Sequence, residues 1–373
     1  MNHSWLKNID TQLIEYLNNL NRHKNSFEYS PVKRGLTKSG EKISLGFSCY
    51  VIKILFTLNE WDKIDKIKKN DWVNYIHSFQ QTRDPFPINS YIDNEIYNFY
   101  KNPSIKNTLK DKTKKTLNIV ANKEYKLNDV LFQEAIRADS KQAISTLFQI
   151  GEKNKLPYKD FPKVEKELSN FLNSLNWKKP WSAGGQLAAT SLFTKTQLDK
   201  KDSKRQILLL SEFIKSLSHE DTGLYYLGKL PNKTESINGA MKVITALDWL
   251  DEEIHYPKKL INFCLSTKPS SFGCDLVDIV YVLYKCLIEV EYKRKEIISY
   301  LDDIIGLIYL HYKEEEGGFS YAIEKSQDSY YGLTISNGLN QADLHGTILL
   351  TWALSMIFNI NEDTKFNWKI IKP

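Results

Sequence analysis

The chain has 373 residues, of which 42% are hydrophobic, 12% aromatic and 26% charged, and its formal net charge is +6. This composition excludes a disordered or fibrous chain and is typical of a soluble globular protein with a sizeable core. No window approaches 18 uninterrupted apolar residues and the N-terminus lacks the pattern of a signal peptide, so we expect neither a membrane-spanning segment nor secretion.

An amphipathic helix is expected over Trp5–Leu20, and residues 1–40 are interpreted as an N-terminal helix and loop that pack on the main domain. From Glu41 a helix follows that is apolar around most of its circumference and should lie in the interior. The next helix, Glu60–Gln81, carries lysines on one face and should lie outside. The segment 84–128 is the least regular part of the sequence and is interpreted as an insertion.

Beyond Phe132 the same alternation of amphipathic and nearly all-apolar helices becomes clearer. The residues Trp181–Gly185 are expected to interrupt the helical pattern before a short apolar helix, Gln186–Phe193. The last apolar helix opens at Asp343 and is apolar on nearly every side. Residues 359–373 are expected to form a C-terminal tail.

Sustained period-two alternation is absent, so no sheet is expected. The pairs of amphipathic and apolar helices recur at a spacing of roughly 40–60 residues, which is typical of stacked helix pairs. The six apolar helices begin near Glu41, Phe132, Trp181, Glu235, Phe272 and Asp343. This pattern predicts an all-α protein with an α/α toroid, a double ring of inner and outer helices, as a single domain over residues 41–358.

In a double ring the inner helices begin at one rim, so polar side chains near their starts should converge. Asp, Asn and Glu also favour helix N-caps and first turns, which explains several of them without any ligand. Arg137 and Lys242 are different, because a cation near a helix start opposes the helix dipole and needs an anionic partner. The expected ligand-binding residues are Arg137, Gln142, Gln186, Glu235, Asn238, Lys242, Asp275 and Tyr330.

His345 stands two residues after Asp343, and this spacing is compatible with a general base held by a carboxylate. It is equally compatible with a structural histidine in a capped helix. Two more carboxylates lie near inner-helix starts, and the expected catalytic residues are His345, Asp343, Asp278 and Asp139.

The sequence Glu314-Glu-Glu-Gly-Gly-Phe319 joins an amphipathic helix to an apolar one through a Gly-aromatic turn. This repeat pattern, which extends from about Glu41 to Ile357, resembles that of the superfamily of terpene cyclases and protein prenyltransferases. The resemblance implies an α/α toroid that holds an isoprenoid in its central cavity.

The catalytic signatures of that superfamily are incomplete in this chain. Protein prenyltransferases bind zinc through an Asp-x-Cys-Tyr motif and a later histidine, whereas here the first motif reads Asp278-Ile-Val280-Tyr and the histidine is His345. Class II terpene cyclases use an Asp-x-Asp-Asp motif, and Val277 occupies the place of its proton donor. Neither a metal nor a cofactor is therefore expected.

The four cysteines lack CxxC spacing and lie in apolar contexts, which predicts reduced thiols in a cytoplasmic protein. The lysine-rich segments Lys63–Lys69 and Lys106–Lys115 lack interleaved aromatic residues, so nucleic acid is not an expected partner.

Three functions remain open from the residues. The first is a diverged enzyme of the cyclase or prenyltransferase type that binds an isoprenoid or another ligand in the central cavity. The second is a carbohydrate-active (α/α)6 enzyme, a lyase, hydrolase or epimerase, for which the carboxylates, His345, Tyr330 and Arg137 supply candidate groups. The third is a non-catalytic binding scaffold. The sequence does not indicate the oligomeric state.

Overall fold

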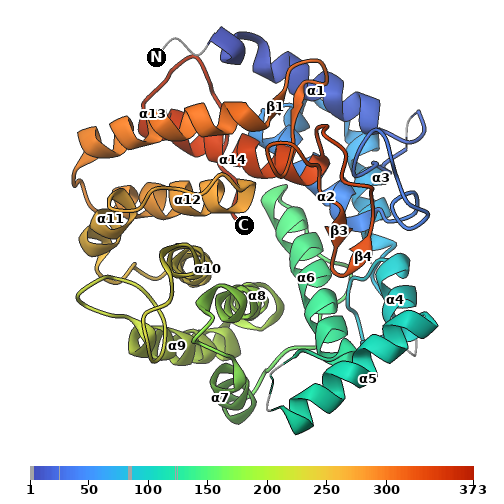
Figure 1. Cartoon of the computed structure of the whole chain (residues 1–373), viewed down its shortest axis with the longest axis vertical. Helices are drawn as coiled ribbons and strands as arrows, with labels where there is room; N and C mark the ends of the chain where they lie inside the picture. Colours follow the sequence, from blue (N-terminus) through green and yellow to red (C-terminus); the bar gives the residue numbers. More distant parts are fainter. Residues whose placement is uncertain (1–3, 25, 83–85, 122, 124) are drawn as a thin grey trace.

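The protein is mostly helical, which confirms the predicted all-α class (Figure 1). The structure is a computed structural model, and it describes residues 4–24, 26–82, 86–121, 123 and 125–373. Within these residues there are fourteen α-helices, two short 3-10 helices and four strands of two residues each.

Six helices occupy the middle of the molecule, and they correspond to the six apolar helices expected from the sequence. They are α2 (Leu45–Thr57), α6 (Asn128–Gln149), α8 (Pro180–Gln197), α10 (Lys233–Leu250), α12 (Gly273–Glu289) and α14 (Leu344–Ile360). Each packs against the next in chain order, and α14 packs against α2, so the contacts form a closed cycle (Figure 1).

The remaining helices surround this cycle. They are α1 (Ile9–Leu20), α3 (Lys66–His77), α4 (Asn94–Lys101), α5 (Ile105–Val120), α7 (Glu165–Ser174), α9 (Lys200–Leu217), α11 (Pro257–Leu265) and α13 (Arg294–His311). Their burial follows their sequences. For example, α9 buries only one stripe that includes Leu210, Ile214 and Leu217, whereas α14 is buried along nearly its whole length.

The inner helices α10 and α12 run in the same direction. Near their starts, Asn238 on α10 donates to Asp275 on α12, and near their ends Lys285 on α12 pairs with Asp248 on α10. The starts of these two helices therefore lie together.

The expected interruption at Trp181–Gly185 is wrong, because α8 runs unbroken through both glycines. A Cβ on Gly184 would lie 2.8 Å from Cβ of Lys242, and a Cβ on Gly239 would lie 2.6 Å from Cβ of Pro180. The glycines let α8 and α10 approach each other closely, so they serve helix packing and do not mark a turn.

The expectation of no sheet is also wrong in a small way. Two antiparallel hairpins precede α14: β1 (Tyr312–Lys313) pairs with β2 (Gly318–Phe319), and β3 (Ser329–Tyr330) pairs with β4 (Leu333–Thr334). Pairs of two residues carry no periodicity that a sequence pattern could detect.

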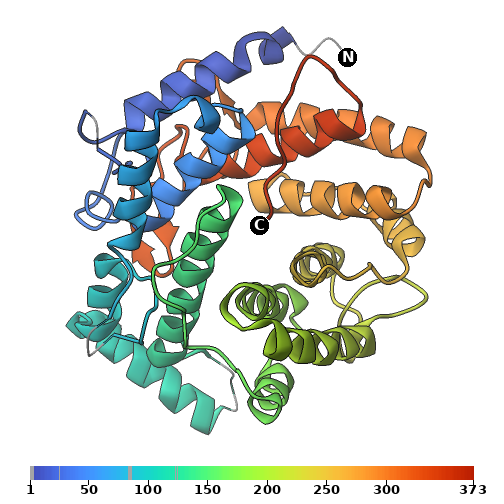
Figure 2. The ribbon, with the colours of Figure 1, turned by 180° about the vertical axis from the view of Figure 1, so that it is seen from behind.

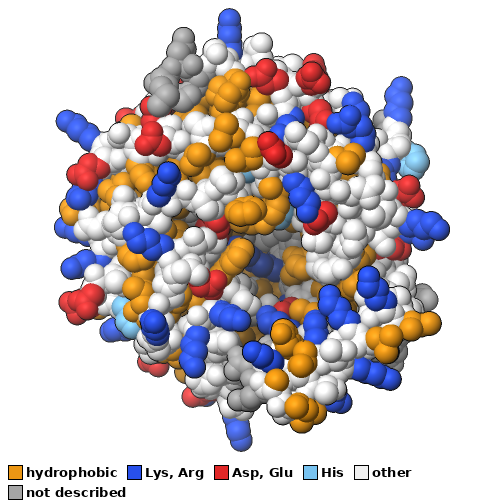
Figure 3. All heavy atoms as spheres, viewed as in Figure 1, with side chains coloured by type: hydrophobic (Ala, Val, Ile, Leu, Met, Phe, Trp, Pro, Cys, Tyr) orange, Lys and Arg blue, Asp and Glu red, His pale blue; other side chains and the backbone are white. Residues whose placement is uncertain are grey.

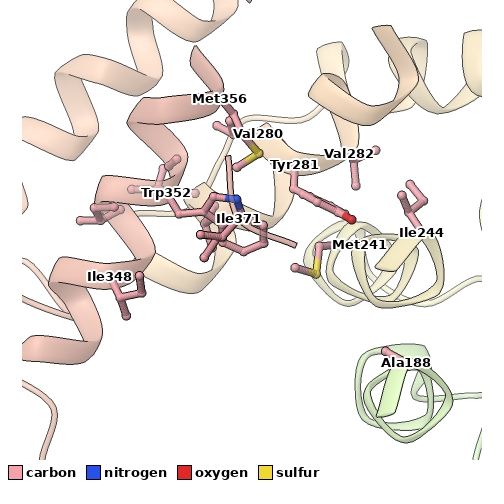
Figure 4. Packing of buried hydrophobic residues seen from close by; sticks show 14 of the residues in the cluster. Ala188, Met241, Ile244, Val280, Tyr281, Val282, Ile348, Trp352, Met356 and Ile371 are labelled. Atoms are coloured by element: carbon pink, nitrogen blue, oxygen red, sulfur yellow. The ribbon is translucent and has the colours of Figure 1, made fainter. Parts of the chain in front are cut away.

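The C-terminal tail runs to the middle of the face seen in Figure 2, where it contacts the ends of α2, α6 and α10. The Lys369 backbone N–H donates to Thr57 at the end of α2, and the Lys372 N–H donates to Gln149 at the end of α6. The Trp249 indole donates to the backbone oxygen of Pro373. Ile371 is 4% exposed and lies among buried side chains of α12 and α14 (Figure 4), so the tail closes this side of the cycle.

The irregular segment expected over 84–128 contains α4 and α5, and its residues 84, 85, 122 and 124 lie outside the described part of the chain. Among the described residues, α5 has no buried side chain. No helix in the described ranges is both long and apolar enough to cross a membrane.

Candidate functional site

The face of the molecule seen in Figure 3 is hollowed at its centre, and basic side chains lie at the bottom of the hollow. Several side chains of the inner helices retain solvent access there, although the helices themselves are interior. We call this feature the central hollow. We use this name also for a group of half-buried side chains of the inner helices that interact with one another, namely Tyr50, Lys141, Lys242, Cys274 and His345.

Three lysines from three inner helices, Lys53, Lys141 and Lys242, lie close to one another. Lys53 on α2 is buried, and its Nζ donates to Ser145 Oγ at 2.9 Å. Burial lowers the pKa of Lys53 to about 8. Burial also lowers the pKa of Lys141 on α6 to about 7, and repulsion by Lys242 and Lys53 adds to this effect. Lys53 and Lys242 are therefore close enough to destabilise the charge of Lys141.

No carboxylate of the described residues forms an ion pair with any of these lysines. The ion pairs present in that part of the chain involve other cations, most of them at the surface. Neighbouring cations that are buried or half-buried and have no paired anion are costly, because surroundings of lower dielectric constant than water strengthen their repulsion. The central hollow is thus electrostatically suited to an anion.

Asp278 is a buried carboxylate that interacts with Lys242, and it lies in the second turn of α12. It is 2% exposed and its Oδ2 has no hydrogen-bond partner among the described residues. Burial raises its pKa to about 7, and the charge of Lys242 acts in the opposite direction. At neutral pH this carboxyl group is therefore able either to give or to accept a proton.

His345 lies in the first turn of α14 between two aromatic rings. Its ring stacks on Tyr50 at 5.5 Å and on Tyr321 at 5.1 Å between centroids, with interplanar angles of 7° and 11°. Its Nδ1 has no hydrogen-bond partner among the described residues. Burial lowers its pKa to about 4, and the charge of Lys242 lowers it further, so the imidazole is neutral at physiological pH.

Cys274 and Asp275 complete this side of the central hollow. The Cys274 thiol contacts the Tyr321 hydroxyl at 3.3 Å, and burial raises the pKa of the thiol to about 11, so it is not a thiolate nucleophile. Asp275 accepts a hydrogen bond from Asn238 at 2.6 Å and another from Ser270. The structure therefore brings together five of the expected residues, namely Asn238, Lys242, Asp275, Asp278 and His345.

Two other expected residues cap helices. Asp343 accepts from the Gly346 N–H through Oδ1 and from the Tyr321 and Gln327 N–H groups through Oδ2, and it is fully buried. Both of its oxygens are thus occupied by backbone N–H groups, and that of His345 also contributes. Glu235 accepts from the Trp181 backbone N–H at 2.9 Å, so it caps the neighbouring helix α8.

Asp139 and Tyr330 form a separate buried group at the junction of α2, α6 and β3. Asp139 accepts from the Asp93 backbone N–H at 3.0 Å, while its Oδ1 has no partner among the described residues. Burial, and to a lesser extent the Asp93 carboxylate, raise the pKa of Asp139 well above its usual value. Tyr330 packs on Phe47.

Arg137 and Gln186 lie in a different pocket, of about 440 Å³, between α6, α7 and α8. Arg137 donates to Gln186 at 2.7 Å and its guanidinium lies 5.2 Å from the Phe171 ring centroid. Gln142 donates to Thr146, one turn further along α6. These expected ligand-binding residues do not join the three lysines.

Sequence reasoning missed Lys53, Lys141 and the two tyrosines that enclose His345. One signal for Lys53 was available, because it is the only charged residue in the apolar helix LGFSCYVIKILFT. Such an isolated cation in a buried helix indicates a partner or a ligand. Tyr321 precedes α14 in a loop, and no periodicity marks it. Among the described residues, no group of three or more His, Cys, Asp or Glu side chains is arranged to hold a metal ion.

Comparison with known proteins gives no match: none of the protein-family models, curated proteins or solved structures that were searched is similar to this chain.

Proposed function

We propose that the chain is an α/α toroid whose central hollow binds a small anionic molecule, and that Asp278 and His345 exchange protons with it. The proposal rests on one observation: Lys53, Lys141 and Lys242 lie close together, and none of them forms an ion pair with a carboxylate of the described residues. The closed cycle of six inner helices supports the toroid.

A bound anion would remove the main cost of this arrangement. Repulsion by Lys53 and Lys242 disfavours the charged form of Lys141, whereas a phosphate or carboxylate between them favours it. The pKa of Lys141 therefore rises when an anion binds, and near neutral pH the protein takes up protons on binding.

The same anion would change the protonation of the two candidate acid–base groups. Lys242 lowers the pKa of His345, and it also lowers that of Asp278 against the larger effect of burial. Once an anion neutralises Lys242, both pKa values rise toward a range in which the groups donate protons. The arrangement thus supports proton transfer to or from a ligand held by its anionic group.

Of the functions that the sequence left open, this arrangement favours those with an anionic substrate. A carbohydrate-active enzyme acting on an acidic sugar satisfies the lysines through the sugar carboxylate. A prenyl diphosphate satisfies them through its phosphates, and the rings of Tyr50 and Tyr321 add an aromatic wall. Cyclisation by an acid of the class II type is not favoured, because Val277 replaces that acid and is buried.

Calorimetric titration with pyrophosphate, glucuronate and farnesyl diphosphate tests anion binding and separates the ligand classes. We expect Lys141→Met to weaken binding of the preferred anion by about tenfold or more, as is usual for losing a charge-assisted contact. Lys200→Met removes an exposed lysine at the start of α9 and serves as the matched control. Equal affinity of the two variants would contradict the proposed site.

The involvement of His345 is tested by following its ring protons in an NMR titration, with His345→Gln to assign them. In the free protein we expect the imidazole to stay neutral down to about pH 4. Saturation with the preferred anion should raise that pKa measurably. A pKa that does not change on binding would place the anion away from His345 and would leave a binding protein without this acid–base group.

A further inference from the structure

The outer helix α5 has its polarity reversed relative to a normal surface helix. The face that points to the rest of the protein is polar, and it consists of the half-buried residues Asn107, Thr108, Asp111, Lys114 and Asn118. In contrast, Ile105, Leu109, Ile119 and Val120 are 82%, 59%, 76% and 78% exposed. We call these four residues the apolar ridge of α5.

The polar inner face of α5 has defined partners, so its orientation is fixed by hydrogen bonds. Asp111 accepts from the Asn128 N–H at 2.8 Å, and Lys114 Nζ donates to the Lys126 carbonyl. The Asn118 side chain both donates to and accepts from the backbone of Tyr125. Turning the helix to bury the apolar ridge would break these bonds.

The apolar ridge consists of two exposed aliphatic pairs, Ile105 with Leu109 and Ile119 with Val120, and Lys112 and Thr116 lie between these pairs on the same face. At 3.6 residues per turn its four members fall within about 100° of the helix circumference. The helix carries five lysines and one aspartate, and the aspartate points inward. The exposed lysines are Lys106, Lys110, Lys112 and Lys115. Figure 3 shows hydrophobic and basic side chains together along the edge where α5 lies in Figure 1.

We propose that α5 docks the protein onto the surface of a membrane that contains anionic lipids. Exposed aliphatic pairs at both ends of one helix face, with lysines between and beside them, suit a helix that lies in the interface plane, where aliphatic side chains enter the acyl boundary and lysines extend to the headgroups. The helix lacks the aromatic and arginine residues that are enriched at protein interfaces, and lysines are depleted there. Pairing with a second copy would bring the lysines of both copies together.

Flotation with lipid vesicles tests the proposal with the full chain. We expect binding to vesicles that contain phosphatidylserine and little binding to phosphatidylcholine alone, with binding lost as the salt concentration rises. The double variant Ile105→Ser/Leu109→Ser should lose about tenfold or more in partitioning. The matched control is Leu208→Ser/Ile288→Ser, which changes an exposed leucine and isoleucine, 58% and 60% exposed, on other helices.

Charge reversal provides the second arm. Lys110→Glu/Lys112→Glu should weaken vesicle binding by about tenfold or more, whereas Lys200→Glu/Lys201→Glu on α9 should not. All these side chains are exposed, so circular dichroism and melting temperature should stay unchanged. Absence of vesicle binding would overturn the proposal. So would binding that the lysine variant abolishes while the aliphatic variant leaves it intact, or a dimer in light scattering that only the aliphatic variant dissociates.

Discussion

Replacing Lys141 with methionine should stabilise the protein while it weakens anion binding. Methionine keeps the length and most of the apolar volume of the lysine and removes its charge. In the free protein that charge lies in the central hollow with two other lysines and no ion-paired carboxylate among the described residues. A residue that destabilises the fold but is needed for a ligand is the expected trade-off of a binding site.

The size of the effect follows from the pKa of Lys141. A fall from 10.5 to about 7 corresponds to an upper bound of about 4 to 5 kcal/mol of unfolding free energy when the lysine is charged in the unfolded state. The side chain is only half-buried, so water in the hollow screens part of this cost. We therefore expect a gain of about 1 to 2 kcal/mol, or roughly 2 to 3 °C in melting temperature for a chain of this size.

The pH dependence gives the effect a distinct signature. The folded-state pKa of Lys141 is lowered, so the unfolded state binds more protons between about pH 7 and 10.5, and the stability of the wild type rises with pH through this window. The stabilisation by Lys141→Met should be largest at pH 7 and below and should vanish near pH 10.5. Thermal melts of the wild type, Lys141→Met and the control Lys200→Met over pH 6–10.5 measure this difference.

Two results would refute the reasoning. If Lys141→Met destabilises the protein at pH 7, then the ammonium group has a favourable partner that the described contacts do not contain. If the variant is stabilised equally at every pH, then the gain comes from apolar packing and not from relief of charge repulsion.

Three further predictions concern other parts of the fold. Asp278→Asn should stabilise the protein by about 1 to 3 kcal/mol at pH 7 and by almost nothing near pH 4. The reason is that the raised pKa of about 7 makes the wild type lose stability as the pH rises from 3.8 to 7. Thermal melts across that range would contradict this prediction if the gain in stability were the same at every pH. Ile371→Ala should lower the free energy of unfolding, measured by chemical denaturation, by about 2 to 4 kcal/mol. Ile370→Ala, at the half-buried neighbouring position, should lower it by less than about 1 kcal/mol. Equal losses would mean that the tail does not pack as described. Gly46→Ala should lower the free energy of unfolding by about 1 to 3 kcal/mol, because the added Cβ would lie 2.1 Å from the Tyr330 hydroxyl. An unchanged melting temperature would show that this tyrosine moves freely.

Two cations that were predicted as ligand-binding residues for the same reason lie in different places in the structure. Lys242 was singled out because its charge opposes a helix dipole, and it does lie at the central hollow beside Asp278 and His345. Arg137 was singled out for the same reason, yet it turns toward Gln186 and the outer helix α7. The same local signal therefore leads to two different places, because the side of the helix on which a residue lies depends on how the helix is rotated.

The capping residues show a second limit. Asp343 and Glu235 stand where the sequence placed them, at or near the starts of inner helices, but their oxygens are bonded to backbone N–H groups. A sequence reveals that a carboxylate suits a helix start, and it does not reveal whether any oxygen remains free. That is decided by neighbouring loops, such as the one that brings the Tyr321 and Gln327 N–H groups to Asp343.

The sequence by itself determined the helical class, the six apolar helices and the tail, because hydrophobic periodicity records which side chains must leave water. It misread Gly184 and Gly185 as an interruption, since the need for close contact between α8 and α10 is not local. The tertiary structure was needed to bring Lys53, Lys141 and Lys242 close together. It was also needed to place His345 between Tyr50 and Tyr321, which are 271 residues apart in sequence. Charges and rings that meet from separate helices leave no pattern along the chain, so the chemistry of the central hollow is a property of the packing.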